Sequence, residues 1–277
     1  MRATVRATND PARVLREAGA FLTSDPVRHN VILTLLRARV AHPEPGRYWV
    51  IDVDGEIAGV VFQSPLDHFA AVTPMTTDVM TEAVVRIADE GVRLPGIDGD
   101  AATAARFAGA WTECTRSAAV PVLGERIYEV DTVLPARSAV GALRLALVGD
   151  FDRVAQLMRE FALEIAEVEG DEDEHTRQRL DAGQLWVWDD QEIVAVAGLS
   201  KPAAGAVRIG PVYTSVDRRT RGYATALVAA ISARARADGL RCILYTDLGN
   251  AGSNSIYRAI GYVAVAEGIR YRFEPSS

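Results

Sequence analysis

The chain of 277 residues has little of what marks several whole classes of protein. Its two cysteines, Cys114 and Cys242, are too few for a disulfide framework, and neither they nor the histidines are spaced as metal ligands. The apolar runs are short and interrupted, and no signal-type apolar core follows Met1. We therefore expect a cytoplasmic protein with no metal site and no membrane segment.

Lysine is almost missing, because Lys201 is the only one and arginine supplies the remaining positive charge. Together with abundant alanine, this bias suggests a GC-rich bacterial genome. The net charge of −7 argues against a general nucleic-acid binder. A hydrophobic content of 49% and a charged content of 24% are typical of a globular protein, and the chain is long enough for two domains.

Two familiar phosphate motifs are also absent, the dinucleotide fingerprint and the P-loop. Instead, residues 212–227 run from an apolar strand through a basic turn into a helix. Gly222 lacks a Cβ, so the backbone there can approach a ligand closely, and the following amides point toward whatever lies at the helix N-terminus. Arg218, Arg219 and Arg221 add positive charge. This segment therefore predicts a phosphate-binding loop.

The loop Arg219-Thr220-Arg221-Gly222-Tyr223-Ala224 resembles the pyrophosphate loop of the GNAT acetyltransferases, which reads Arg/Gln-x-x-Gly-x-Gly/Ala and binds acetyl-CoA. A strand at 241–246 and a short helix follow. That helix carries Asn254 three residues before Tyr257 and ends in Gly-Tyr, as in the family's second motif. The resemblance covers about residues 142–273 and implies an α/β fold with a mixed sheet.

The resemblance also implies a cofactor site. Two strands, 207–214 and 241–246, would separate at Gly210-Pro211, where a proline removes a ladder donor and a glycine favours a bulge. The pantetheine arm would lie between them, and a strand amide near residues 212–214 would stabilise the oxyanion. The residues expected to bind acetyl-CoA are Val212, Tyr213, Thr214, Arg219, Thr220, Arg221, Gly222, Tyr223, Ala224, Thr225 and Asn254.

Tyr257 is the expected acid, because a phenol with a pKa of about 10 can support a departing thiolate with a pKa of about 8.5. The alternatives are a core tyrosine at this position and a helix N-cap at Asn254. No glutamate lies in the strand before the loop, where many family members have their base, and Arg208 lies near that place. Asp247, Glu164, Glu167 or a water relay remain as candidate bases.

The acidic segment 160–174 includes Glu164 and Glu167, which we expect to line the acceptor pocket. Such a rim would attract a cationic amine by steering it. A solvated acidic loop, placed to favour the N-terminus of the next helix, accounts for the same residues equally well.

The first half repeats the pattern of the second. Residues 49–61 and 186–197 both read as strand, polar turn and strand, and two further segments correspond. We expect two tandem GNAT-like domains, 1–132 and 142–277, joined by a linker at 133–141. Residues 72–80 contain neither glycine nor arginine where the second half has its loop, so the first domain should not bind CoA. It would serve as a pseudo-dimer partner or shape the acceptor pocket.

These observations predict an N-acetyltransferase that moves an acetyl group from acetyl-CoA to a primary amine of a small molecule, or less readily of a peptide or protein. A non-catalytic acyl-CoA sensor is the alternative. The missing strand glutamate favours the sensor, whereas Asn254 and Tyr257 favour the enzyme. We expect a monomer or a weak homodimer.

Overall fold

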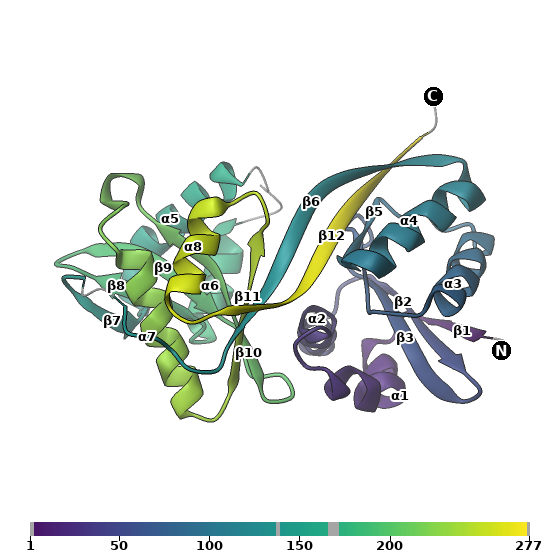
Figure 1. Cartoon of the computed structure of the whole chain (residues 1–277), viewed down its shortest axis with the longest axis horizontal. Coiled ribbons are helices and arrows are strands. Elements are labelled where there is room, and N and C mark those ends of the chain that lie inside the picture. The colour runs from purple at the N-terminus through teal and green to yellow at the C-terminus, as the bar shows by residue number, and fades with distance from the viewer. Residues whose placement is uncertain (1–2, 137–138, 166–171, 276–277) are drawn as a thin grey trace. The chain divides into compact units, whose positions relative to one another are not determined.

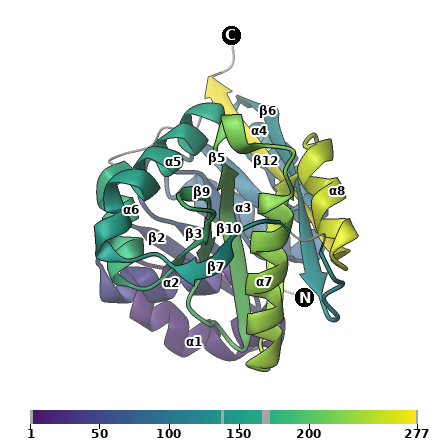
Figure 2. The ribbon, with the colours of Figure 1, turned by 90° about the vertical axis from the view of Figure 1, so that its left-hand side faces the viewer.

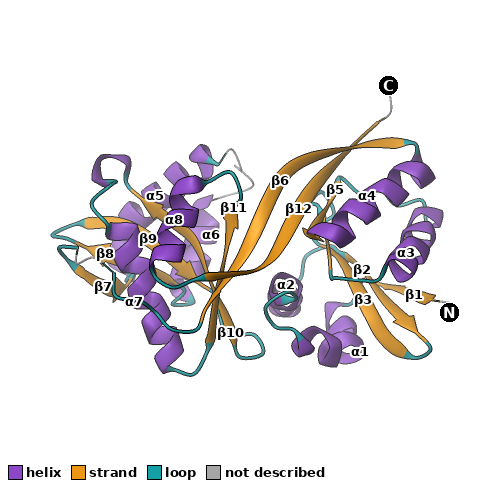
Figure 3. Cartoon of the chain, viewed as in Figure 1, coloured by secondary structure: helices purple, strands orange, loops and turns teal. Residues whose placement is uncertain are grey.

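The computed structural model describes residues 3–136, 139–165 and 172–275. The chain divides into two compact units. Unit 1 comprises Met1–Ile127, Asp247–Gly249 and Ala264–Ser277, and unit 2 comprises Tyr128–Thr246 and Asn250–Val263. Each unit is a mixed α/β structure, as the sequence predicts (Figures 1 and 3).

Unit 1 has its sheet in the order β1-β2-β3-β4-β5-β12. All described pairs of neighbours are antiparallel except β4 and β5. The turn between β2 and β3 is formed by Asp54 and Gly55, both with positive φ, which is the conformation a two-residue hairpin of type I′ requires. The elements are β1 (Ala3–Thr8), α1 (Pro11–Ser24), α2 (Asn30–Ala41), β2 (Arg47–Val53), β3 (Glu56–Gln63), β4 (Ala70–Val72), α3 (Thr77–Asp89), β5 (Gly96–Asp100), α4 (Ala101–Thr115), β6 (Ser117–Val130) and β12 (Val263–Pro275).

Unit 2 repeats this succession of elements, so the predicted duplication is present in the fold. Its strands follow the order β7-β8-β9-β10-β11-β6. The elements are β7 (Ala142–Leu145), the 3₁₀ turn η1 (Val148–Asp150), α5 (Phe151–Glu164), α6 (Glu172–Asp181), β8 (Leu185–Asp189), β9 (Ile193–Leu199), β10 (Ala206–Thr214), the 3₁₀ turn η2 (Val216–Arg218), α7 (Tyr223–Ala237), β11 (Arg241–Asp247) and α8 (Ala251–Ala259).

The last strand of the chain, β12, does not complete the sheet of the half that precedes it. It pairs antiparallel with β5 of unit 1, and Arg270 on β12 forms an ion pair with Asp98 on β5 at 2.9 Å. Tyr128–Val130, at the end of β6, belong to unit 2. The linear boundaries expected from the sequence assign residues 264–277 to the second domain, because the pattern of a strand does not say which sheet the strand joins.

Helices cover both faces of the sheet in unit 2, with α5 and α6 on one face and α7 and α8 on the other (Figure 2). Side chains alternate between these faces along β10, as in any strand. Val207 and Ile209 pack with Leu227 and Ile231 of α7, whereas Tyr213 packs with Leu157 of α5 and Leu180 of α6. The α5/α6 face and the α7/α8 face are therefore chemically separate surfaces of the same strand.

None of the described helices has both the length and the apolar character needed to cross a membrane.

Candidate active site

Strands β10 and β11 separate where the sequence predicts that they should. They are paired in parallel only from Ala206–Arg241 to Ile209–Leu244. The next residues are Gly210 and Pro211, and the register of β10 with β9 shifts between Ile209 and Val212. Beyond this point β10 keeps its pairing with β9 alone, so one edge of Val212–Thr214 is left without a strand partner.

The free edge presents backbone amides toward the gap between the strands. Ser215 donates its amide to Val194 O on β9 at 3.1 Å, and donors alternate along an antiparallel strand. The amides of Val212 and Thr214 therefore point away from β9. The hydroxyl of Thr214 is also buried without a hydrogen-bond partner in the described part of the chain. Buried polar atoms of this kind usually have a partner, so this strand edge fits a polar ligand such as the amide-bearing pantetheine arm.

The loop before α7 has two residues in the left-handed region, Thr220 with φ 65° and Gly222 with φ 84°. Gly222 is the N-cap of α7, and no side chain caps this end of the helix. The first helical hydrogen bond runs from Ala226 N to Gly222 O at 2.9 Å. The amides of Tyr223, Ala224 and Thr225 thus lie in the first turn, where backbone donors lack helical partners and favour an anion.

The three arginines around this loop are not equally available to a phosphate. Arg219 forms an ion pair with Glu164 at the end of α5, and its Nε donates to Thr214 O at 3.2 Å. Arg218 pairs with Glu192 and with Asp217. Only Arg221 is exposed and without a carboxylate partner in the described residues. Ion pairs therefore offset the charges of Arg218 and Arg219, which the sequence does not distinguish from the charge of Arg221.

Two tyrosines of the predicted cofactor set have side chains with partners inside unit 2, and the Tyr213 ring lies 5.2 Å from Cζ of Arg219 in the loop. Tyr223 is buried and donates its hydroxyl to Asp190 at 2.5 Å, and this bond raises the pKa of Tyr223. Tyr213 lies against Phe161 of α5, and burial raises its pKa.

Asn254 and Tyr257 lie one helical turn apart on α8, and both are buried. Asn254 Oδ1 accepts from the Tyr128 hydroxyl at 3.0 Å, and Asn254 Nδ2 donates to Asn250 O at 2.7 Å. The N-cap of α8 is Asn250, whose side chain accepts from Ser253 N, so the N-cap alternative for Asn254 is wrong. Tyr128 was not predicted from the sequence, because it lies 126 positions from Asn254 and forms no local motif with it.

Burial raises the pKa of Tyr257 to about 12. Its ring lies between Tyr128 and Tyr262, with centroids 6.3 and 6.1 Å away. The phenol therefore remains protonated at every physiological pH. Because a free thiol has a pKa of about 8.5, complete proton transfer from Tyr257 to a thiolate is unfavourable, and a hydrogen bond to the sulfur is the better-matched role.

The candidate bases have other partners or are not described. Glu164 is engaged with Arg219, and Asp247 accepts from Gly249 N at 2.7 Å in the turn after β11. Glu167 lies outside the described residues. In the described residues no group of three or more His, Cys, Asp or Glu side chains could hold a metal ion.

The equivalent region of unit 1 is closed. Strands β4 and β5 stay paired up to Val72–Gly99, at the very end of β4. The connection from β4 to α3 consists only of residues 73–76, whereas residues 215–222 connect β10 to α7. Thr73 N donates to Val60 O at 3.1 Å, and Met75 N donates to the Thr103 hydroxyl at 3.2 Å. These loop amides are used within unit 1, which supports the expectation that the first half lacks a CoA site.

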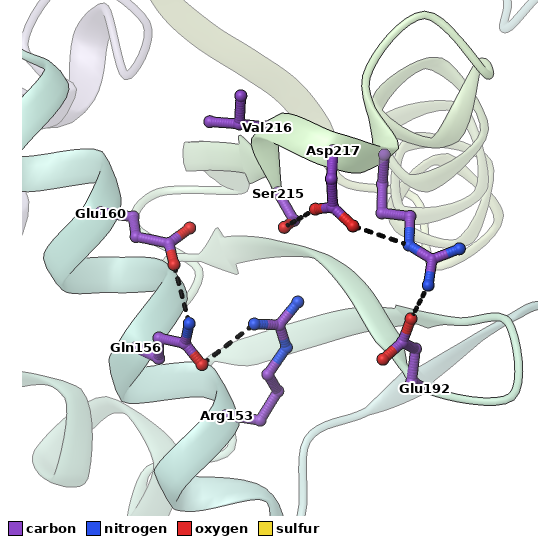
Figure 4. A pocket seen from close by; sticks show the side chains of 8 residues that line it. Arg153, Gln156, Glu160, Glu192, Ser215, Val216 and Asp217 are labelled. Carbon is purple, nitrogen blue, oxygen red and sulfur yellow. Dashed lines mark hydrogen bonds and ion pairs between the residues drawn. The ribbon is translucent and has the colours of Figure 1, made fainter.

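A cavity of about 640 Å³ opens beside η2 on the α5 side of unit 2 (Figure 4). Its charged groups mostly bond to one another: Arg218 contacts Asp217 and Glu192, and Glu160 accepts from Gln156 Nε2 at 2.9 Å. This mutual pairing gives the cavity no strong preference for an anion or a cation. The lining residues are Arg153, Gln156, Glu160, Glu192, Ser215, Val216, Asp217 and Arg218.

Comparison with known proteins assigns the class of unit 2. Residues 151–262 match the model of the acetyltransferase (GNAT) family. This segment contains the separated strands, the loop before α7 and both polar residues of α8. Residues 151–262 are therefore a GNAT domain, the domain of N-acetyltransferase enzymes. No curated protein matches the chain in sequence.

Solved structures share the fold of nearly the whole chain. A GNAT-family acetyltransferase from Colwellia psychrerythraea has 12% identity and a TM-score of 0.64, covering 98% of this chain and 99% of its own. A GCN5-related N-acetyltransferase from Sphaerobacter thermophilus has 17% identity and a TM-score of 0.62, covering 99% and 96%. A tandem GNAT protein from the clavulanic acid biosynthesis pathway has 13% identity and a TM-score of 0.59, covering 99% of both chains. The likeness therefore extends to both halves.

Proposed function

We propose that unit 2 transfers an acetyl group from acetyl-CoA to the primary amine of a small molecule. The observation that carries the proposal is the end of the β10–β11 ladder at Ile209–Leu244, followed by the uncapped N-terminus of α7. The strand edge supplies donors for an extended polar arm, and the helix end supplies donors for a pyrophosphate. Both features lie on one continuous segment, residues 210–225.

The backbone would hold most of the cofactor. Val212 and Thr214 would donate amides to the pantetheine arm or to the oxyanion, and the amides of Tyr223–Thr225 would bind the pyrophosphate. Arg221 would add a positive charge that no described carboxylate neutralises. Asn254, whose side chain is held by Tyr128 and Asn250, would contact the cofactor arm.

The reaction needs a neutral amine at the thioester carbonyl. The amine nitrogen attacks the carbonyl carbon, a C–N bond forms, the C–S bond breaks, and the nitrogen loses one proton to solvent. The Tyr257 hydroxyl would donate a hydrogen bond to the departing sulfur, which takes its proton from water. The products are an amide and the free thiol of CoA.

The proposal is tested by measuring thiol release from acetyl-CoA over a panel of small amines, amino acids and lysine peptides, with binding of acetyl-CoA measured by calorimetry. Release with at least one small amine is expected. Tight binding without release from any amine would contradict the enzymatic role and leave a binding module. Absence of binding would remove the cofactor assignment itself.

A further inference from the structure

Two arginines lie on the α5/α6 face of unit 2 where β10 and β11 separate. Arg179 of α6 donates from Nη2 to Gly210 O at 2.7 Å. Arg208 lies on β10 two residues before Gly210, and its Cζ is 5.6 Å from the ring centroid of Tyr245. Tyr245 follows Leu244, the last residue of β11 that pairs with β10. Arg208 is therefore held beside the end of the β10–β11 pairing, and Arg179 is held at the bulge of β10 that follows it.

The position of Arg179 depends on the glycine at position 198. A Cβ added to Gly198 on β9 would lie 2.9 Å from Arg179 Cζ and 2.5 Å from Gly210 O. Any side chain at Gly198 would therefore displace the guanidinium. The sheet has a recess here in which the guanidinium lies, partly buried, against the bulge at Gly210.

Neither arginine has an ion-pair partner among the described residues, in contrast to Arg144, Arg218, Arg219 and Arg241 of the same unit. Burial, and to a smaller extent the charge of Arg208, lowers the pKa of Arg179 to about 10. Glu172 opposes this shift but forms no ion pair with Arg179. Two partly buried cations close to each other and without an ion-pair partner cost folding free energy. A ligand that supplies further negative charge would reduce this cost.

The guanidinium group selects the kind of ligand. Its planar array of donors matches a carboxylate in a two-point contact, and such charge-assisted bonds are short and strong. We propose that Arg179 and Arg208 bind a carboxylate carried by the amine acceptor, so that the acceptor is an amino acid or a similar compound with an amine close to a carboxylate. This inference rests on the proposed function, because it places the acceptor beside the thioester.

The same two charges would help the acceptor react. A cationic environment disfavours the protonated form of a nearby amine, which lowers the pKa of that amine. The acceptor would then reach its neutral, nucleophilic form without a carboxylate base. This explains why the carboxylates considered as bases can be engaged elsewhere, Glu164 with Arg219 and Asp247 with Gly249.

The test uses the full chain and pairs of acceptors that differ only in the carboxylate, such as phenylalanine with phenylalaninamide and lysine with 1,5-diaminopentane. The variants are Arg179→Gln and Arg208→Gln, with Arg179→Lys to keep the charge without the planar array. Arg177→Gln is the matched control, because Arg177 lies on the same helix, is exposed and stacks on Phe151. Circular dichroism and thermal unfolding establish that each variant folds.

We expect wild-type kcat/KM to favour the carboxylate-bearing member of a pair. Loss of a hydrogen bond to a charged group is worth about 1.5–3 kcal/mol, or about a 10- to 100-fold change. Arg179→Gln and Arg208→Gln should lower kcat/KM by this factor for the carboxylate-bearing acceptors, mainly through KM. The loss for the other acceptors should be smaller, and the Kd of acetyl-CoA should stay unchanged. Arg179→Lys should restore part of the loss. Equal losses for both members of a pair would overturn the inference.

Two further measurements distinguish a carboxylate on the acceptor from a carboxylate on the acyl donor. In the first, succinyl-CoA replaces acetyl-CoA, so that the acyl donor itself carries a carboxylate. A preference for succinyl-CoA that disappears in Arg179→Gln would assign the site to the donor and overturn the acceptor assignment. Calorimetry with amino acids and the protein–CoA complex needs no turnover. If amino acids bind and Arg179→Gln weakens this binding, the carboxylate site is supported even if the proposed acetyl transfer fails. If amino acids do not bind, the carboxylate site is rejected.

Discussion

The conformation of Gly222 gives the sharpest test of the loop before α7. Its φ of 84° is in the left-handed region, and a Cβ added there would have no atom within 4 Å. The change Gly222→Ala therefore introduces strain without a clash. A non-glycine residue in this region costs about 1–2 kcal/mol. If the loop relaxes to avoid this cost, the amides at the start of α7 turn away from the positions a pyrophosphate needs.

Gly205 provides a matched control in the same unit. It has φ 78° and, like Gly222, no atom within 4 Å of an added Cβ, but it lies in the connection between β9 and β10. Gly205→Ala and Gly222→Ala should lower the free energy of unfolding by similar amounts, about 1–2 kcal/mol each, in urea denaturation without ligand.

Only Gly222→Ala should weaken the binding of acetyl-CoA. Loss of one hydrogen bond to a charged group costs about 1.5–3 kcal/mol, so the Kd of acetyl-CoA for this variant, measured by calorimetry, should rise about 10- to 100-fold. The Kd of Gly205→Ala should equal that of the wild type. Wild-type affinity in Gly222→Ala, at the expected loss of stability, would refute the assignment of this helix end to the pyrophosphate.

Four further predictions concern the contacts of unit 2. Tyr257→Phe should lower kcat by at least about 10-fold and leave the Kd of acetyl-CoA unchanged. An unaltered kcat would exclude a catalytic hydrogen bond from the Tyr257 hydroxyl to the departing sulfur. The pKa of Tyr257 in the folded protein is raised to about 12, above its unfolded value, so its contribution to stability is full below about pH 10 and is lost as the pH rises through 12. The difference in tyrosinate absorbance between the wild type and Tyr257→Phe should therefore show no titration near pH 10. A titration step near pH 10 would contradict the argument that burial raises this pKa. Tyr128→Phe removes the hydrogen bond that the Tyr128 hydroxyl donates to Asn254 Oδ1 and should destabilise the protein by about 1–3 kcal/mol in urea denaturation. An unchanged midpoint would show that this bond contributes little. Thr220→Gly removes the strain of a φ of 65°, so the free energy of unfolding should rise by about 1 kcal/mol and the urea midpoint should rise with it. A lower midpoint would mean that the hydrogen bond from the Thr220 hydroxyl to Arg219 O outweighs the strain.

Local patterns predicted the backbone of the site well. Gly210-Pro211 and Gly222 act through their own φ values and missing donors or side chains, so their effects do not depend on distant residues. The interruption of β10, the left-handed loop and the start of α7 are all present. The repeated order of elements followed from the same kind of local signal.

Side-chain partners were not predictable in this way. Arg219 and Glu164 are 55 positions apart, and their ion pair changes an expected phosphate ligand and an expected acceptor ligand into partners of each other. Tyr128 and Asn254 are 126 positions apart. Neither pair has a spacing that periodicity could detect, because only the packing of α5 and β6 in unit 2 brings them together.

The sequence by itself determined that unit 2 has a glycine-bearing loop at a helix start, preceded by an interrupted strand, and that unit 1 repeats the fold with a shorter connection. These are properties of short segments, set by backbone geometry and hydrophobic periodicity. Only the tertiary structure decided that β12 pairs with β5 and that two of the three loop arginines form ion pairs with carboxylates. It also decided that Arg179 contacts the bulge of β10, close to Arg208, with no ion pair to either arginine among the described residues. The reason is physical, because the charge balance of a site depends on which distant side chains the fold brings within a few ångströms.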